Sequence, residues 1–146
     1  MNHLKLPKEV NVKRKKMYLL YCLLSLAMLA GCVGAKQADN FQTMTLDYTL
    51  IGGLSSPNPE IRLTNVPPGT AFLKVTMRDH HSPGFNHGGG TIAYDGSGRV
   101  PEGSLRGYRG PEPPAGEVHR YEIKVQALNA DQSQVLGEGS LVKNYP

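Results

Sequence analysis

The sequence predicts a mainly β domain, compact and all-β or nearly so. Three observations favour this fold class. Short segments alternate apolar and polar residues, which is the pattern of strands with one buried face. The chain has 17 Gly and 11 Pro among its 146 residues, a content typical of a fold with many turns. No stretch after residue 42 repeats its apolar residues every 3.6 positions, so helix should be scarce.

The first predicted strands lie in the N-terminal half of this domain. Residues 44–50 carry apolar side chains at every even position, and Gly52 and Gly53 end this strand. A short strand follows at 61–63, between two turns that contain proline. Residues 73–77 alternate Leu, Val and Met with polar residues and form the best-defined strand of this half.

The second half should contribute further strands around a long irregular loop. The glycines at 88–90 are interpreted as a flexible bend, and a short strand follows at 91–94. The Gly- and Pro-rich stretch 103–116 can hardly form regular structure. Residues 121–127 alternate cleanly between apolar and polar side chains, and residues 136–145 supply a closing strand.

The formal charge of +4 at pH 7 belongs to the N-terminal part of the chain. Six of the 16 basic residues and one of the 12 acidic residues precede Cys32. The remaining chain, with ten basic and eleven acidic residues, is nearly neutral. We therefore expect no nucleic-acid partner, because nucleic acid is bound through a basic surface.

The N-terminal part has the three components of a secretory signal peptide. Residues 13–16 are all basic, residues 17–29 are apolar and uncharged, and a site of small residues follows. The apolar stretch is shorter than the ~20 residues that span a bilayer as a helix. The Leu-Ala-Gly-Cys sequence at 29–32 resembles the lipobox of bacterial lipoproteins. This resemblance implies a lipoprotein signal peptide at 1–31 and a diacylated Cys32.

Lipidation at Cys32 would anchor the protein in the cell envelope, with the lipid bilayer as a partner. Val33 rather than aspartate follows the cysteine. By resemblance to the usual sorting pattern, this favours the outer membrane facing the periplasm in a Gram-negative host. An uncleaved anchor and an ordinary signal peptide with a chance cysteine are the alternatives. Residues 32–42 are polar and small, so we expect a tether there and the folded domain at 43–146.

Two polar segments at the ends of predicted strands could hold a functional site. The first, 79–87, has one aspartate and three histidines, and the second, 110–121, includes Glu112, Glu117 and His119. For the two glutamates, a solvated turn is a simpler interpretation than an acid–base pair. No serine or cysteine of the mature chain stands in a nucleophile motif, so we expect binding without catalysis.

These segments resemble the phosphatidylethanolamine-binding protein and Raf kinase inhibitor-like family. The Gly-Pro-Glu-Pro-Pro sequence at 110–114 and the His-Arg-Tyr sequence at 119–121 are the most specific part. Residues 79–83 are similar to the family's Asp-Pro-Asp-Ala-Pro motif. The resemblance implies a β-sandwich-like fold with a shallow pocket for phosphate-type anions. By position, the residues of this pocket would be Asp79, His87, Gly110, Pro111, Pro113, Pro114, His119 and Tyr121.

The chain departs from the family pattern around the expected pocket. His80 and His81 replace a proline and an aspartate, and Gly88 replaces an aromatic residue beside the pocket histidine. Only residues 129–134 separate the last two predicted strands, so the C-terminal helix that relatives carry is missing. We expect a more open pocket as a result.

The sequence thus predicts a membrane-anchored lipoprotein that binds a small anionic or phosphate-bearing ligand and requires no cofactor. Two alternatives stay open. In relatives the pocket region also contacts kinases and proteases, so the domain could be an inhibitor or interaction module with a vestigial pocket and an envelope protein as partner. His80, His81 and His87 could instead bind Zn²⁺ or Cu²⁺, although their spacing matches no standard motif.

Overall fold

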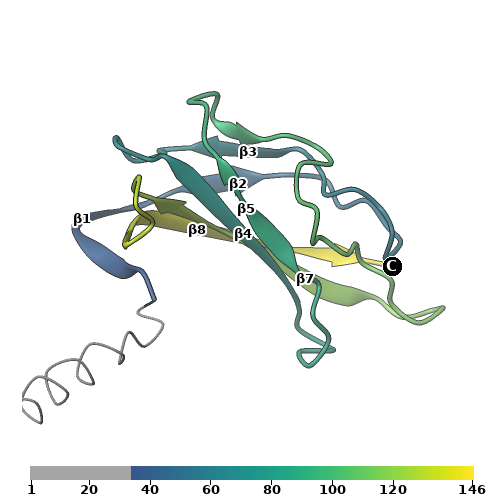
Figure 1. Cartoon of the computed structure of the whole chain (residues 1–146). Helices are drawn as coiled ribbons and strands as arrows, with labels where there is room; N and C mark the ends of the chain where they lie inside the picture. Colours follow the sequence, from purple (N-terminus) through teal and green to yellow (C-terminus); the bar gives the residue numbers. More distant parts are fainter. Residues whose placement is uncertain (1–33) are drawn as a thin grey trace, which may run out of the picture. The chain divides into compact units, whose positions relative to one another are not determined.

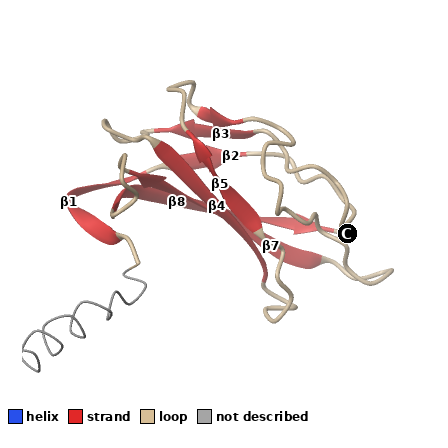
Figure 2. Ribbon diagram, viewed as in Figure 1, coloured by secondary structure: helices blue, strands red, loops and turns tan. Residues whose placement is uncertain are grey.

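The computed structural model describes residues 34–146, which form eight strands and no helix (Figures 1 and 2). The predicted signal peptide at 1–31 and the predicted lipidation site Cys32 lie outside the described residues. Within 34–146, no helix is long and apolar enough to cross a membrane. The strands are β1 (Lys36–Thr43), β2 (Thr45–Asp47), β3 (Ile61–Thr64), β4 (Phe72–Asp79), β5 (Gly89–Ala93), β6 (Arg99–Val100), β7 (His119–Leu128) and β8 (Gln134–Tyr145).

The strands form two sheets that pack on each other as a sandwich. The larger sheet has the order β1-β8-β7-β4-β5, and the smaller has the order β2-β3-β6. Figure 2 shows the smaller sheet layered against the larger one. One cluster of buried apolar side chains contains residues of both sheets, among them Leu63 of β3, Val100 of β6 and Ile123 of β7. The mainly β, sandwich-like fold predicted from the sequence is confirmed.

Strands β4 and β7 form the centre of the larger sheet and determine where the site lies. In both strands every second residue is buried, and each fully buried aliphatic side chain contributes about 1.5–3 kcal/mol of hydrophobic stabilisation. The strands pair antiparallel, with Val75 opposite Val125 and Asp79 opposite Tyr121. The buried face of β4 therefore continues as far as Asp79. A buried carboxylate requires polar partners, which the loops at this end of the sheet provide.

The structure corrects the predicted tether. Lys36–Thr43 forms strand β1, which pairs in parallel with β8 and has an irregular register between Gln37 and Gln42. The compact unit accordingly begins at Ala35. Ala38 is the one buried residue of β1, so the strand covers little apolar surface. Its polar sequence therefore resembles that of a linker.

The glycines at the start of β5 form a tightly packed crossing, so the prediction of a flexible bend is wrong. A β-carbon on Gly88 would lie 1.8 Å from the carbonyl oxygen of Gly107, and one on Gly89 would lie 2.0 Å from that of Val75. Both glycines have positive φ angles, +66° and +133°, which other residues rarely adopt. This close approach fixes the end of the loop that carries His87.

The stretch from 103 to 116 is irregular, as predicted, and a buried asparagine holds its beginning in place. The side-chain amide of Asn58 donates to the carbonyl oxygens of Pro59 and Pro101, each over 2.9 Å. Its Oδ1 accepts from the backbone N–H of Leu105 over 2.8 Å. Three bonds to one buried side chain replace the regular backbone pairing that this loop lacks.

Candidate functional site

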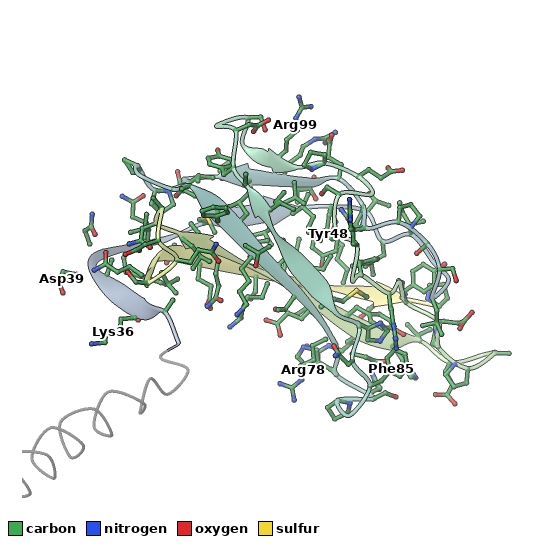
Figure 3. The ribbon with its side chains drawn as sticks, viewed as in Figure 1. Lys36, Asp39, Tyr48, Arg78, Phe85 and Arg99 are labelled. Carbon is green, nitrogen blue, oxygen red and sulfur yellow. The ribbon has the colours of Figure 1, made fainter. Side chains whose placement is uncertain are left out.

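The ends of β4 and β7 bring an aspartate and a histidine into contact. Asp79 is the last residue of β4 and His119 is the first residue of β7, and both side chains are buried. The Asp79 Oδ2 accepts a hydrogen bond from Nδ1 of His119, and the two atoms are 2.7 Å apart. This end of the sheet also carries the loop with Phe85, which is labelled in Figure 3. The structure thus brings together two residues that the sequence predicts for the site.

Asp79 is stabilised in its charged form by several donors. Besides His119, the backbone N–H groups of His81 and Ser82 donate to its Oδ1 over 2.7 and 3.2 Å. Burial by itself would raise the pKa of the Asp79 carboxyl. The bonds from His119 and from the two backbone groups outweigh burial, so the pKa lies below its ordinary value. Asp79 is therefore a fixed negative charge at the base of the site.

His119 is held between two carboxylates. Its Nδ1 faces Asp79, and its Nε2 lies 3.0 Å from Oε2 of Glu117. A carboxylate only accepts hydrogen bonds, so while both contacts are formed both ring nitrogens donate and the ring is an imidazolium. The hydrogen bond to Asp79 and then the one to Glu117 raise the pKa of His119 above its ordinary value. The interpretation of Glu117 as a purely solvated turn residue is therefore incomplete.

His87 supplies a second buried imidazole. Its Nδ1 donates to the carbonyl oxygen of Arg109 over 2.9 Å, which leaves Nε2 as the nitrogen free to meet a ligand. The His87 ring packs edge-on against Tyr121, with 5.3 Å between ring centroids, and against Phe85, with 4.7 Å. Nε2 is therefore the atom of His87 through which the ring can exchange a hydrogen bond with a ligand.

Tyr121 lies behind the two histidines. Its side chain is buried, and its ring stacks on that of His119 with 6.2 Å between centroids. Burial, together with the nearby charge of Asp79, raises the pKa of the Tyr121 hydroxyl to about 12. The phenol is therefore neutral at physiological pH and serves as a rigid support for both imidazole rings.

A pocket of about 230 Å³ opens beside these groups. Its volume is below the ~300–1,000 Å³ of sites for drug-sized ligands, so it fits a small molecule or a head group. Four residues predicted from the resemblance are on its wall, whereas Gly110, Pro111, Pro113 and Tyr121 are not among the residues that line it. The wall consists of Leu54, Asp79, Ser82, Phe85, His87, Glu112, Pro114 and His119.

The predicted Gly-Pro-Glu-Pro-Pro sequence at 110–114, here called the proline loop, shapes the site by packing closely against another loop. A β-carbon on Gly110 would lie 2.4 Å from the carbonyl oxygen of Gly53, so only glycine allows this approach. The N–H of Gly53 donates to the carbonyl oxygen of Pro111 over 2.8 Å. These contacts hold residues 51–56 beside the proline loop and bring Leu54 to the pocket. The sequence carries no local signal for this contact, because it joins segments more than 50 residues apart.

The three histidines proposed as a metal site are not brought together. His80 contacts Glu122, with 3.3 Å between Nε2 and Oε2. His81 instead stacks on His119 with 4.8 Å between ring centroids, and its Nδ1 accepts from the backbone N–H of Arg120 over 3.1 Å. Among residues 34–146, the potential metal ligands that cluster are those of Asp79, His81 and His119.

That cluster is already hydrogen-bonded. The Nδ1 of His119 is bound to Asp79, and the Nδ1 of His81 is bound to the backbone. The two rings are nearly parallel, at 22° to each other. The lone pairs of an imidazole lie in its ring plane, so two stacked rings do not point toward one ion. A metal would therefore have to break these bonds and turn a ring.

A second cavity, of about 220 Å³, lies beside the smaller sheet. Three of its four charged residues, Asp47, Glu60 and Arg62, are paired within the protein. The Nζ of Lys143 lies 3.2 Å from Oδ1 of Asp47, and Nε of Arg62 lies 3.2 Å from Oε1 of Glu60. The pocket at the ends of β4 and β7 is therefore the candidate site.

Comparison with known proteins supports the fold. No protein-family model and no curated protein sequence matches the chain. Among solved structures, the chain is similar to a phosphatidylethanolamine-binding protein homologue from Chlamydia trachomatis, with a TM-score of 0.52 and 16% sequence identity. The match covers 71% of this chain and 97% of the homologue. The chain has the phosphatidylethanolamine-binding protein fold.

This result confirms the fold that the sequence resemblance implied. In this version of the phosphatidylethanolamine-binding protein fold, β7 and β8 pair directly as an antiparallel hairpin. Residues 129–133 form the turn between them and contain no helix, so the predicted loss of the helix is confirmed. Because the likeness is at 16% identity, it establishes the fold, and the ligand has to be inferred from the site itself.

Proposed function

We propose that the chain is a binding protein that holds a small phosphate-bearing anion in the pocket at the ends of β4 and β7, without catalysis. The observation that carries this proposal is the presence of two buried imidazole rings, His87 and His119, on the wall of one small pocket. His119 is charged through its contact with Asp79 and donates hydrogen bonds. The Nε2 of His87 has no hydrogen-bond partner among residues 34–146 and is available to form a hydrogen bond with the ligand.

The surroundings of the two rings strengthen their interaction with an anion. Leu54 and Phe85 form an apolar part of the wall. Apolar side chains beside a site replace part of the water there and lower the local dielectric constant, so each charge-assisted hydrogen bond becomes stronger than it would be in water. The proposed ligand class is therefore a compact phosphate group, either free or as part of a larger head group.

Isothermal titration calorimetry on the full chain in a non-ionic detergent tests this proposal. We expect inorganic phosphate to bind, and His87→Ala or His119→Ala to weaken binding by about tenfold or more, since each removes a hydrogen bond to a charged ligand. His80→Ala is the matched control, because His80 faces Glu122 outside the pocket. Phosphoethanolamine in a parallel titration separates a head group from free phosphate.

Three results would contradict the proposal. Unchanged affinity in both pocket variants would place the binding elsewhere. Binding of Zn²⁺ that depends on His81, without binding of phosphate, would establish a metal site at Asp79, His81 and His119 instead. If neither phosphate nor Zn²⁺ binds, the protein-interaction module is favoured instead.

The interaction module has an observation of its own. The exposed large apolar side chains of residues 34–146 are Leu54, Phe85 and Val118. Two of them lie on the pocket wall, and Val118 directly precedes His119. Exposed apolar groups on the wall of a pocket are typical of surfaces that contact another protein. This second candidate uses the same end of the sheet.

We further propose that Cys32 carries lipid and anchors the domain in the cell envelope, facing the periplasm from the outer membrane in a Gram-negative host. The support is the basic, apolar and small-residue sequence that precedes the cysteine. In whole cells labelled with palmitate, Cys32→Ala should abolish labelling of the protein. Cys22→Ala is the control, because the predicted cleavage removes Cys22, and it should label normally. Labelling that persists in Cys32→Ala would contradict the anchor.

A further inference from the structure

Glu117 already occupies the part of His119 that a ligand would use. The ring has two N–H groups, and the one at Nδ1 is bound to the buried carboxylate of Asp79. The other, at Nε2, is bound to Oε2 of Glu117 over 3.0 Å. An anion that enters the pocket must therefore share this N–H with Glu117 or replace it.

The two partners of His119 differ in how firmly they are held. The side chain of Asp79 is 4% exposed and accepts two further backbone hydrogen bonds. The side chain of Glu117 is 60% exposed, and its carboxylate has no other hydrogen bond among the described residues. Exposed side chains change rotamer within nanoseconds or faster. The contact at Nε2 can therefore open while the one at Nδ1 stays closed.

The backbone around Glu117 lets its side chain leave without disturbing the core. Its N–H closes a turn by donating to the carbonyl oxygen of Pro114 over 3.0 Å. Gly116, the residue before it, has a φ of +86°, and no atom lies within 4 Å of where its β-carbon would be. The turn stands free on the surface, so the Glu117 side chain has solvent to move into.

We propose that Glu117 is an internal anion that competes with the phosphate-bearing ligand for Nε2 of His119. This inference rests on the proposed function and adds a regulating residue to the same site. The bound carboxylate keeps the imidazolium paired while the pocket has no ligand. A ligand must then supply a better acceptor than a tethered carboxylate, whose effective concentration is high because it belongs to the same chain.

The size of the effect follows from the exposure of Glu117. An ion pair with an exposed partner gives at most roughly a fivefold preference for the paired state. Apparent affinity is reduced by the fraction of molecules in which the site is free. Removing the carboxylate should therefore tighten binding by about three- to tenfold, which includes the loss of repulsion between the ligand and a nearby negative charge.

The test is a titration of inorganic phosphate into the full chain in detergent, followed by calorimetry. Glu117→Gln keeps the length of the side chain and removes its charge, and Glu117→Ala removes the acceptor as well. Both should bind phosphate about three to ten times more tightly than the unmodified chain. Glu102→Gln makes the same change in net charge beside the second cavity and should leave the affinity unchanged. Thermal unfolding should show that all three variants are folded.

The outcomes separate this inference from the proposed function. If the unmodified chain binds phosphate and the Glu117 variants bind it equally or less tightly, Glu117 does not compete, while the phosphate site stands. If Glu102→Gln tightens binding as much as Glu117→Gln, the effect is one of net charge and the inference is wrong. If no variant binds phosphate, both fail. Binding that emerges only when Glu117 is replaced would support both.

Discussion

Replacing Gly89 with alanine should destabilise the domain more than any of the substitutions named above. We expect the free energy of unfolding to fall by about 3–5 kcal/mol, because two penalties combine. The φ angle of +133° is unfavourable for any residue with a β-carbon. That β-carbon would also lie 2.0 Å from the carbonyl oxygen of Val75, in the middle of β4. The backbone of a central strand cannot move aside without breaking its pairing with β7.

Urea unfolding of the full chain in detergent measures this effect. Gly84→Ala is the matched control, because Gly84 lies in the loop that precedes β5, has no positive φ angle, and has no atom within 4 Å of a β-carbon position. We expect its free energy of unfolding to stay within about 0.5 kcal/mol of the unmodified chain. A similar loss in both variants would show that the close approach at Gly89 is not the cause.

The contact between Asp79 and His119 should make stability depend on pH in both directions. The pKa of Asp79 is lowered from 3.8, so its contribution is present above that pH and is lost as the pH falls through the folded-state value. The pKa of His119 is raised from 6.5, so its contribution is complete below pH 6.5 and is lost as the pH rises through the folded-state value. The melting temperature should therefore be highest between about pH 4 and 6.5.

The fall of the melting temperature above pH 6.5 is the part of this dependence that tests the contact between Asp79 and His119. Other carboxyls with lowered pKa values, such as Asp47 and Glu138, also contribute on the acid side. Above pH 6.5, His119 is the histidine of the described chain whose pKa is clearly raised. Asp79→Asn removes the charge that favours the imidazolium, so most of the decline above pH 6.5 should disappear. His80→Gln should leave the decline intact. If the melting temperature of Asp79→Asn still declines above pH 6.5, the decline does not come from the contact between Asp79 and His119.

Strands with a buried face could be predicted from the sequence, and polar edge strands could not. In β4 and β7 every second side chain enters the core, so the alternation in sequence reports the structure directly. Strand β1 buries Ala38 alone and pairs in parallel with an irregular register, so its sequence carries no such alternation. Strand β6 has two residues, too few for any pattern.

Some residues of the candidate site could likewise be predicted from the sequence, and others could not. Asp79, His87 and His119 could be found because they belong to motifs that resemble a known family. Leu54 reaches the pocket through the contact between two loops, which no local pattern reveals. Glu117 sits in a turn that is polar in sequence and exposed in structure. Its hydrogen bond to His119 depends on the rotamer of one side chain, and a sequence does not report a rotamer.

The position of β1 has a consequence for where the ligand comes from. Lys36 pairs with Gln134, at the end of the sheet where β7 finishes. The pocket is at the other end of β7, whose ten residues extend over about 33 Å. Within the described residues, the start of β1 and the pocket therefore lie at opposite ends of β7, so a ligand reaches the pocket without passing the N-terminal end of the folded unit.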